Sequence, residues 1–117
     1  MAVPEILAEH ISGARASISR ATGLDAAMLA GNAKTYLATA ESYVVPTAGS
    51  AEAFAAARFH IDDFRNEAAG QFALSEREKA SIENARQLVM VALERLERRL
   101  EEARPSDMAT ALGLDWF

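Results

Sequence analysis

Three side chains that could bind a metal ion share one side of an expected helix in the middle of the chain. His60, Asp63 and Glu67 are three and four residues apart, a spacing that places them on one helical face. An imidazole and two carboxylates could hold a divalent cation. Metal sites in helical bundles repeat such a pair on a second helix, and the other histidine, His10, has no carboxylate three or four residues away. We therefore interpret these residues as a solvated polar face and expect no metal site.

Other chemistry has even less support. His10 could accept a phosphoryl group, because helical bundles serve in phosphorelays, but it lies barely two turns from the N-terminus and is better interpreted as a surface histidine. The chain has no cysteine. It also has no glycine-rich phosphate loop and no spacing of Ser, His and Asp that suggests a triad. We expect a non-enzymatic protein without catalytic residues or a bound cofactor.

Aromatic side chains offer an alternative function, a regulatory bundle that binds a small ligand. Tyr36 and Tyr43 are seven residues apart on one side of an expected helix. With Phe54 and Phe64 they could line a pocket between helices. The simpler interpretation places both tyrosines at the edge of the core, with their hydroxyl groups in water.

Residues 75–104 belong to the longest stretch without glycine or proline, and they predict a helix around which the rest of the chain is organised. Ser75 and Glu78 form a capping-box pattern at its start, and Pro105 ends it. Its apolar residues recur at alternating steps of three and four, the a/d pattern of a coiled-coil-like seam. The seam consists of Ile82, Ala85, Val89, Ala92 or Leu93, Leu96, Leu100 and Ala103.

Two helices are expected in the first part of the chain. Residues 3–21 carry an apolar stripe at helical spacing and end at Gly23, a natural residue after a helix C-terminus. Residues 25–44 form the second helix, which Gly31 and Asn32 interrupt. We interpret this interruption as a kink. The alternative is that Gly31 marks the true turn between the first two helices.

A third helix follows a clear loop signal at Pro46 and Gly49. Ser50 is expected to cap it, and its apolar stripe is rich in phenylalanine. The stripe consists of Phe54, Ala57, Ile61, Phe64, Ala68 and Phe72. The short connection at residues 70–75 predicts that this helix and the long one pack as an antiparallel hairpin.

These elements predict an all-α fold, an antiparallel four-helix bundle with a long coiled-coil-like fourth helix and a short C-terminal helix. Residues 1–104 would form the bundle, and residues 105–117 the short helix, capped by Ser106, and an aromatic tail. At about 1.5 Å per residue the long helix would span roughly 43 Å. Either the rest of the chain lies along its whole length, or part of it projects and pairs with another chain.

Charge and hydropathy exclude several classes of partner. The formal net charge is −5, which argues against binding to nucleic acid. The arginines of the long helix alternate with glutamates, unlike a phosphate-binding stripe. No apolar run approaches the ~18 residues of a membrane span, and the first residues lack the pattern of a signal peptide. We expect a cytoplasmic protein that binds neither nucleic acid nor membrane.

The C-terminus is apolar, although chain ends are usually polar. It could fold back over one end of the bundle or insert into a groove of a partner, where Trp is a favoured anchor. Together with the long helix it predicts a protein-protein interaction or assembly (adaptor) protein that acts as a homo-oligomer, most simply a homodimer. The tail could also bind another protein. The predicted interface residues are Leu93, Leu96, Leu100, Leu112, Leu114, Trp116 and Phe117.

Overall fold

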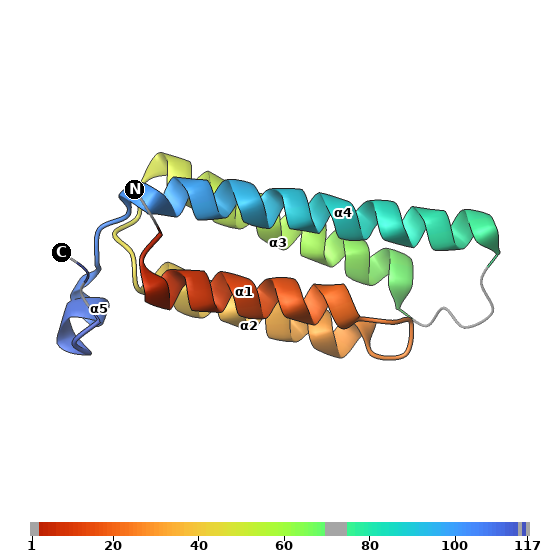
Figure 1. The fold of residues 1–117 in the computed structure, drawn as a ribbon, viewed down its shortest axis with the longest axis horizontal. Helices are drawn as coiled ribbons and strands as arrows, with labels where there is room; N and C mark the ends of the chain where they lie inside the picture. The colour runs from red at the N-terminus through yellow and green to blue at the C-terminus, as the bar shows by residue number, and fades with distance from the viewer. Residues whose placement is uncertain (1–2, 70–74, 115, 117) are drawn as a thin grey trace.

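The computed structural model describes residues 3–69, 75–114 and 116. They form α1 (Glu5–Arg20), α2 (Ala26–Ser42), α3 (Ala48–Ala68), α4 (Glu76–Arg99), the 3-10 turn η1 (Leu100–Glu102) and α5 (Asp107–Ala111). The four long helices run up and down in an elongated bundle, and α5 lies at the end where both termini are found (Figure 1). The predicted all-α helical bundle is confirmed.

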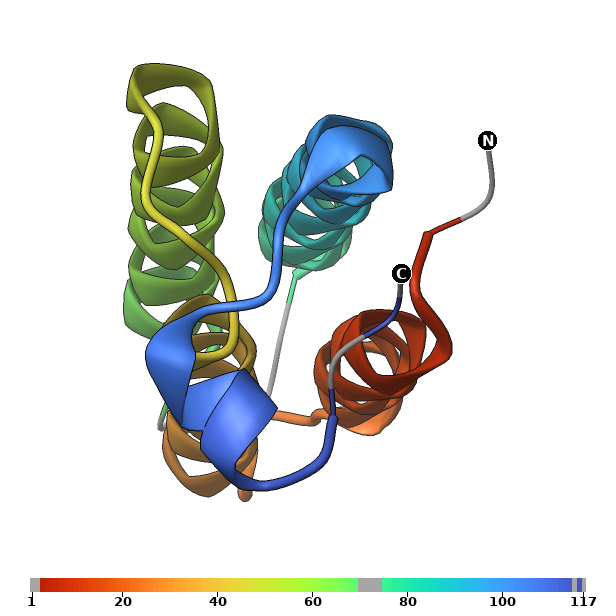
Figure 2. The ribbon, with the colours of Figure 1, turned by 90° about the vertical axis from the view of Figure 1, so that its left-hand side faces the viewer.

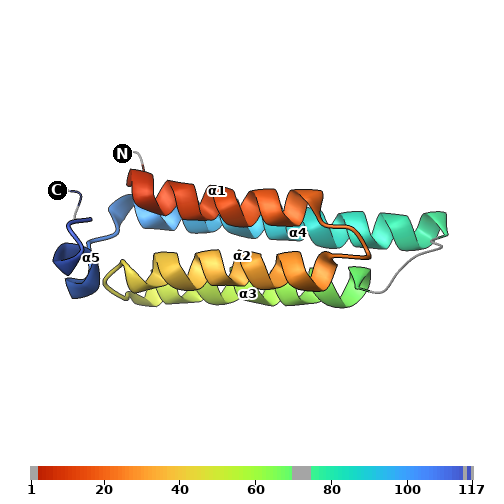
Figure 3. The ribbon, with the colours of Figure 1, turned by 90° about the horizontal axis from the view of Figure 1, so that it is seen from below.

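The bundle consists of two helical hairpins, α1–α2 and α3–α4, which are the two most extensive helix pairs. The α2 and α3 helices also pack closely, whereas the seam between α1 and α4 is looser. Seen from the end, the four helices surround one core (Figure 2). Seen from below, α4 extends beyond α1, α2 and α3 at the end where it begins (Figure 3).

The α3–α4 hairpin forms as predicted, because the two helices bury the stripes that the sequence pattern indicates. The large side chains of the α3 stripe, Phe54, Ile61 and Phe64, are fully buried. The buried residues of α4 are Ile82, Ala85, Val89, Ala92, Leu93 and Leu96. The last residue of the predicted α3 stripe, Phe72, lies outside the described residues.

Side-chain hydroxyl groups cap the N-termini of three helices. Ser75 Oγ accepts the amide N–H of Glu78 at 3.2 Å, as predicted for α4, although the Glu78 carboxylate accepts from the Ser75 hydroxyl instead of its amide. The prediction that Ser50 caps α3 is wrong, because Thr47 is the cap. The two side chains each accept the other residue's amide N–H at 3.0 Å. Ser106 caps α5 as predicted.

The first two helices are separated near Gly23, not at Gly31. The α2 helix runs without interruption from Ala26 to Ser42. Gly31 lies on its exposed side, with no atom within 4 Å of the position that a Cβ would occupy. Gly13 in α1 differs, because a Cβ there would lie 2.7 Å from Cε1 of Tyr36. Of these two glycines, Gly13 therefore allows a close helix–helix approach and Gly31 does not.

Replacing Gly31 with alanine should stabilise the protein by about 0.5–1 kcal/mol, because alanine loses less backbone entropy than glycine in a helix. Chemical denaturation of the variant measures this gain. Gly13→Ala is the matched control, since the Tyr36 ring must move to admit the methyl group. A Gly31→Ala variant less stable than the parent chain would contradict the assignment of Gly31 to an open helix surface.

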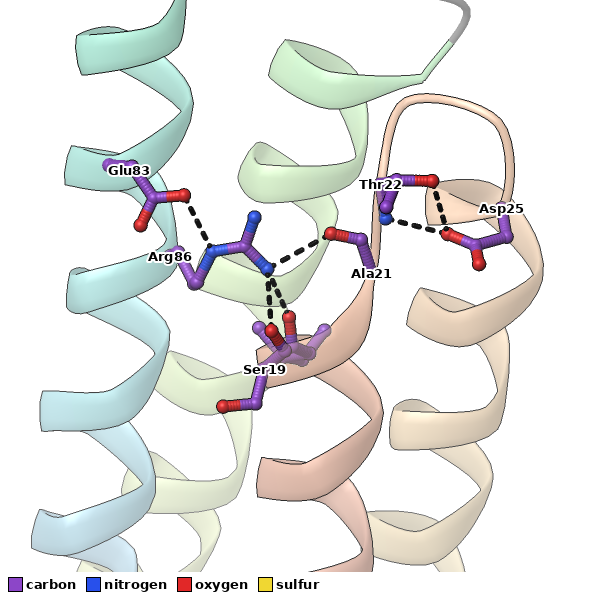
Figure 4. Close-up of polar contacts among 7 residues, drawn as sticks. Ser19, Ala21, Thr22, Asp25, Glu83 and Arg86 are labelled. Carbon is purple, nitrogen blue, oxygen red and sulfur yellow. Dashed lines mark hydrogen bonds and ion pairs between the residues drawn. The ribbon is translucent and has the colours of Figure 1, made fainter.

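Arg86 bridges the loose seam between α1 and α4 (Figure 4). Its Nη1 donates to the carbonyl oxygens of Ser19 at 3.3 Å and Ala21 at 3.1 Å, and to that of Ile18. The last carbonyl groups of a helix have no partner within the helix and carry partial negative charge. The guanidinium group of α4 therefore caps the C-terminus of α1.

Further contacts hold Arg86 in this position. Its Nε donates to Glu83 at 3.0 Å, and the guanidinium carbon lies 5.0 Å from the centre of the Phe64 ring. The side chain is only 15% exposed. A second bridge, Arg15 to Glu97 at 3.2 Å, crosses the same seam further along.

Side-chain hydrogen bonds also stabilise the turn between α1 and α2 (Figure 4). Asp25 Oδ1 accepts the amide N–H of Thr22 at 2.6 Å and its hydroxyl at 3.1 Å. The Thr22 amide is the main cause of a pKa for the Asp25 carboxyl below its ordinary value, because the bond favours the charged form. The turn therefore prefers an ionised Asp25.

Arg86→Ala should destabilise the protein by about 2 kcal/mol, because the variant loses the charge-assisted hydrogen bonds to the carbonyl groups of Ile18, Ser19 and Ala21. Urea unfolding measures the change. The control is Arg98→Ala, which removes an exposed ion pair with Glu94 and should cost about 0.5 kcal/mol or less. Equal losses in the two variants would show that Arg86 does not act as a cap.

Candidate docking surface

The seam predicted to pair with a second chain is occupied within this one. Leu93, Leu96 and Leu100 are all 0% exposed and belong to the core. A coiled-coil-like spacing predicts burial but does not say which helix supplies the partner, and here the neighbouring helices of the same chain do so. Contact with a second chain through these leucines would require the bundle to open.

The aromatic tail folds back onto the bundle at Trp116. Its indole Nε1 donates to the carbonyl oxygen of Ala103 at 2.9 Å, and the ring packs against the core. Leu114 is half-buried and lines a shallow hollow with Trp116 beside the start of α1. Leu112 is 60% exposed, and Phe117 lies outside the described residues.

A groove of about 430 Å³ lies between α3 and α4 on the outer side of the bundle. Leu88 and Val91 of α4 line it although they are 47% and 43% exposed. Small residues of α3, Gly49, Ala53 and Ala56, line the opposite side. The groove therefore has a large apolar ridge on one helix and a low, open strip on the other.

The exposed apolar surface continues along α3. Phe59 is 66% exposed and lies three residues after Ala56, on the same side of the helix. We call Phe59, Leu88 and Val91, with the groove and the charged residues at its two ends, the α3–α4 face.

One end of the α3–α4 face is basic. Arg95 and Arg99 line the groove there, opposite a single carboxylate, Glu52. Within the described ranges, neither arginine forms an ion pair. The nearby Glu94 and Glu97 instead pair with other arginines, at 2.6 Å and 3.2 Å. Folding thus sorts the alternating charges of α4 and leaves two guanidinium groups on this face.

The predicted polar face of α3 belongs to the same surface. His60 lines the groove, and its Nδ1 is buried without a hydrogen-bond partner among the residues described. Asp63 and Glu67 are exposed further along, where Glu67 lies 3.4 Å from the hydroxyl oxygen of Ser81. In the described part of the chain, no group of three or more His, Asp or Glu side chains is placed to hold a metal ion.

The aromatic residues of the alternative, ligand-binding function do not come together. Phe54 and Phe64 are fully buried in the core. Tyr36 and Tyr43 instead meet His10 of α1 edge-on, with ring centres 6.2 Å and 5.7 Å away. Tyr36 is 41% exposed. These four residues therefore do not surround a common pocket.

Comparisons with models of protein families, with curated proteins and with solved structures found no match. None of the helices that the structure describes is long and apolar enough to span a membrane. The shape, apolar surface and charge of the α3–α4 face therefore provide the basis for a functional proposal.

Proposed function

We propose that this chain is a non-enzymatic interaction or assembly protein that acts as a homo-oligomer and docks through the α3–α4 face. The observation that carries the proposal is the exposed apolar ridge of Leu88 and Val91 beside a groove lined with small residues. Exposed apolar patches rimmed by polar residues are typical of interaction sites.

The energetics favour an assembly that depends on concentration. Complete burial of a Val, Leu or Phe side chain contributes about 1.5–3 kcal/mol. Phe59, Leu88 and Val91 are already partly buried, so each would contribute roughly 1 kcal/mol. A symmetric pair buries all three side chains twice, which gives roughly 6 kcal/mol, near the lower end of the cost of association, about 4–15 kcal/mol. Groove packing and charge must supply the remainder.

Leu88→Glu should abolish the homo-oligomer, because it places a carboxylate in the middle of the apolar surface. The chain should stay folded, because this carboxylate remains partly solvated in the monomer. Light scattering after size exclusion, at several protein concentrations, measures the mass, and circular dichroism checks the fold.

Met28→Glu is the matched control, because Met28 is an exposed apolar residue of α2, at 62%, away from the α3–α4 face. It should leave the mass unchanged. The proposal is wrong if the parent chain is monomeric at every concentration, or if Leu88→Glu leaves the oligomer intact.

A second candidate is a small-ligand-binding regulatory bundle that uses the same groove. Its volume, about 430 Å³, is within the range of small-molecule sites. The apolar lining, the two arginines and the unpartnered His60 Nδ1 suit an amphipathic anion.

Decanoate should raise the thermal unfolding temperature in a saturable manner if the groove binds such an anion, because a ligand that binds only the folded chain stabilises it. Decanol is the control without a carboxylate, and Arg95→Gln should weaken the effect. The absence of a saturable shift would remove this candidate.

A further inference from the structure

We infer that the occupant of the α3–α4 face is a second copy of this chain, related by a two-fold axis that makes the paired helices antiparallel. This inference rests on the proposed function and specifies its partner. It follows from the distribution of charge along the face, which is complementary to itself when one copy is turned end for end.

Two contacts establish how α3 and α4 are aligned. A Cβ added to Gly49 would lie 3.6 Å from Nη1 of Arg99, and Glu67 lies 3.4 Å from Ser81. The same number of residues separates Gly49 from Glu67 along α3 and Ser81 from Arg99 along α4. The antiparallel alignment is therefore uniform, and His60 lies level with Leu88.

The charged residues lie at opposite ends of this alignment. Arg95 and Arg99 lie at the end where α3 begins, with Glu52 as the acidic residue of the groove. Asp63 and Glu67 lie near the end of α3, on the side that continues the groove-lining residues at steps of three and four. Phe59, Leu88 and Val91 lie between the two ends.

The acidic residues are available to a partner. Asp63 and Glu67 are both exposed, and no ion pair within the described residues includes either of them. Among the described residues, one end of the face therefore has two arginines outside any ion pair, with Glu52 beside them, and the other has two carboxylates outside any ion pair, of which Glu67 accepts a hydrogen bond from Ser81. A partner with the reverse order of charges would complement both ends.

A second copy has this reverse order when it is turned by a two-fold axis at the level of Phe59 and the Leu88–Val91 turn. This axis packs α4 against α4 of the second copy and α3 against α3. The basic end of each copy then lies level with the acidic end of the other, so that Arg95 and Arg99 approach Asp63 and Glu67 of the second copy diagonally, from α4 to α3. The same rotation brings Leu88 against Val91 and places the two Phe59 side chains near the axis. A two-fold interface uses the same patch twice, so each pairing occurs twice.

A parallel arrangement lacks this charge complementarity, because it brings the two basic ends together and the two acidic ends together. Like charges placed opposite one another disfavour a wrong arrangement strongly, whereas exposed opposite charges add little affinity. The apolar centre would therefore supply the affinity, and the charged ends would select the antiparallel orientation.

Complementary charge reversal tests the arrangement. One variant carries Arg95→Glu and Arg99→Glu, which makes both ends of its face acidic. The other carries Asp63→Lys and Glu67→Lys, which makes both ends basic. Each variant alone should dimerise at least about 100-fold more weakly than the parent chain, because like charges then meet at both ends. An equimolar mixture should form a heterodimer, detected by native mass spectrometry with a mass tag on one variant.

The control variant carries Arg65→Glu and Arg98→Glu, the same change in net charge as in the variant of Arg95 and Arg99 but on other sides of α3 and α4, and it should remain dimeric. A parent dimer that Leu88→Glu dissociates but that survives both charge reversals would overturn the antiparallel pairing and leave the docking face in place. Failure of the mixture to form a heterodimer would also overturn it. A monomeric parent chain would overturn both proposals.

Discussion

The packing of the α3 stripe against the α4 stripe is the constraint on which the rest of the structure depends. Once Phe54, Phe64 and the α4 leucines are buried together, the remaining sides of α4 are defined. One side meets α1 through Arg86 and Glu97. The other is left outside, and it carries an apolar ridge. The division of one helix into a core side and an outer side therefore creates the surface from which a function can be argued.

Periodicity predicted the number of helices, their approximate ends and the buried stripes, because burial of an amphipathic face is a local property of the sequence. The error at the start of α3, and the alternative boundary left open at Gly31, arose where two local solutions are equally good. Thr47 and Ser50 can each act as a cap, and Gly31 is compatible with a turn or an open helix surface. Only the packing of distant residues distinguishes these alternatives.

The candidate surface was harder to predict for a related reason. Ion pairs between helices decide which charges remain available, and Glu97 finds Arg15 far away in the sequence. The alternating charges in the sequence of α4 therefore do not indicate that one end of the α3–α4 face is basic. The ion pairs seen in the fold are needed to infer it. Leu93 and Leu96 show the same limit, since their spacing indicates burial without indicating which chain supplies the partner.

The α1 helix begins, and α5 lies, at the same end of the bundle (Figure 1). In the proposed antiparallel pair, the two copies would place this end of their bundles at opposite ends of the dimer. Anything joined to either terminus would then be held apart by about one bundle length, along a rod whose single chain measures 50 Å. Such a pair is a bipolar spacer, and its span would depend on the length of four helices and not on any flexible linker.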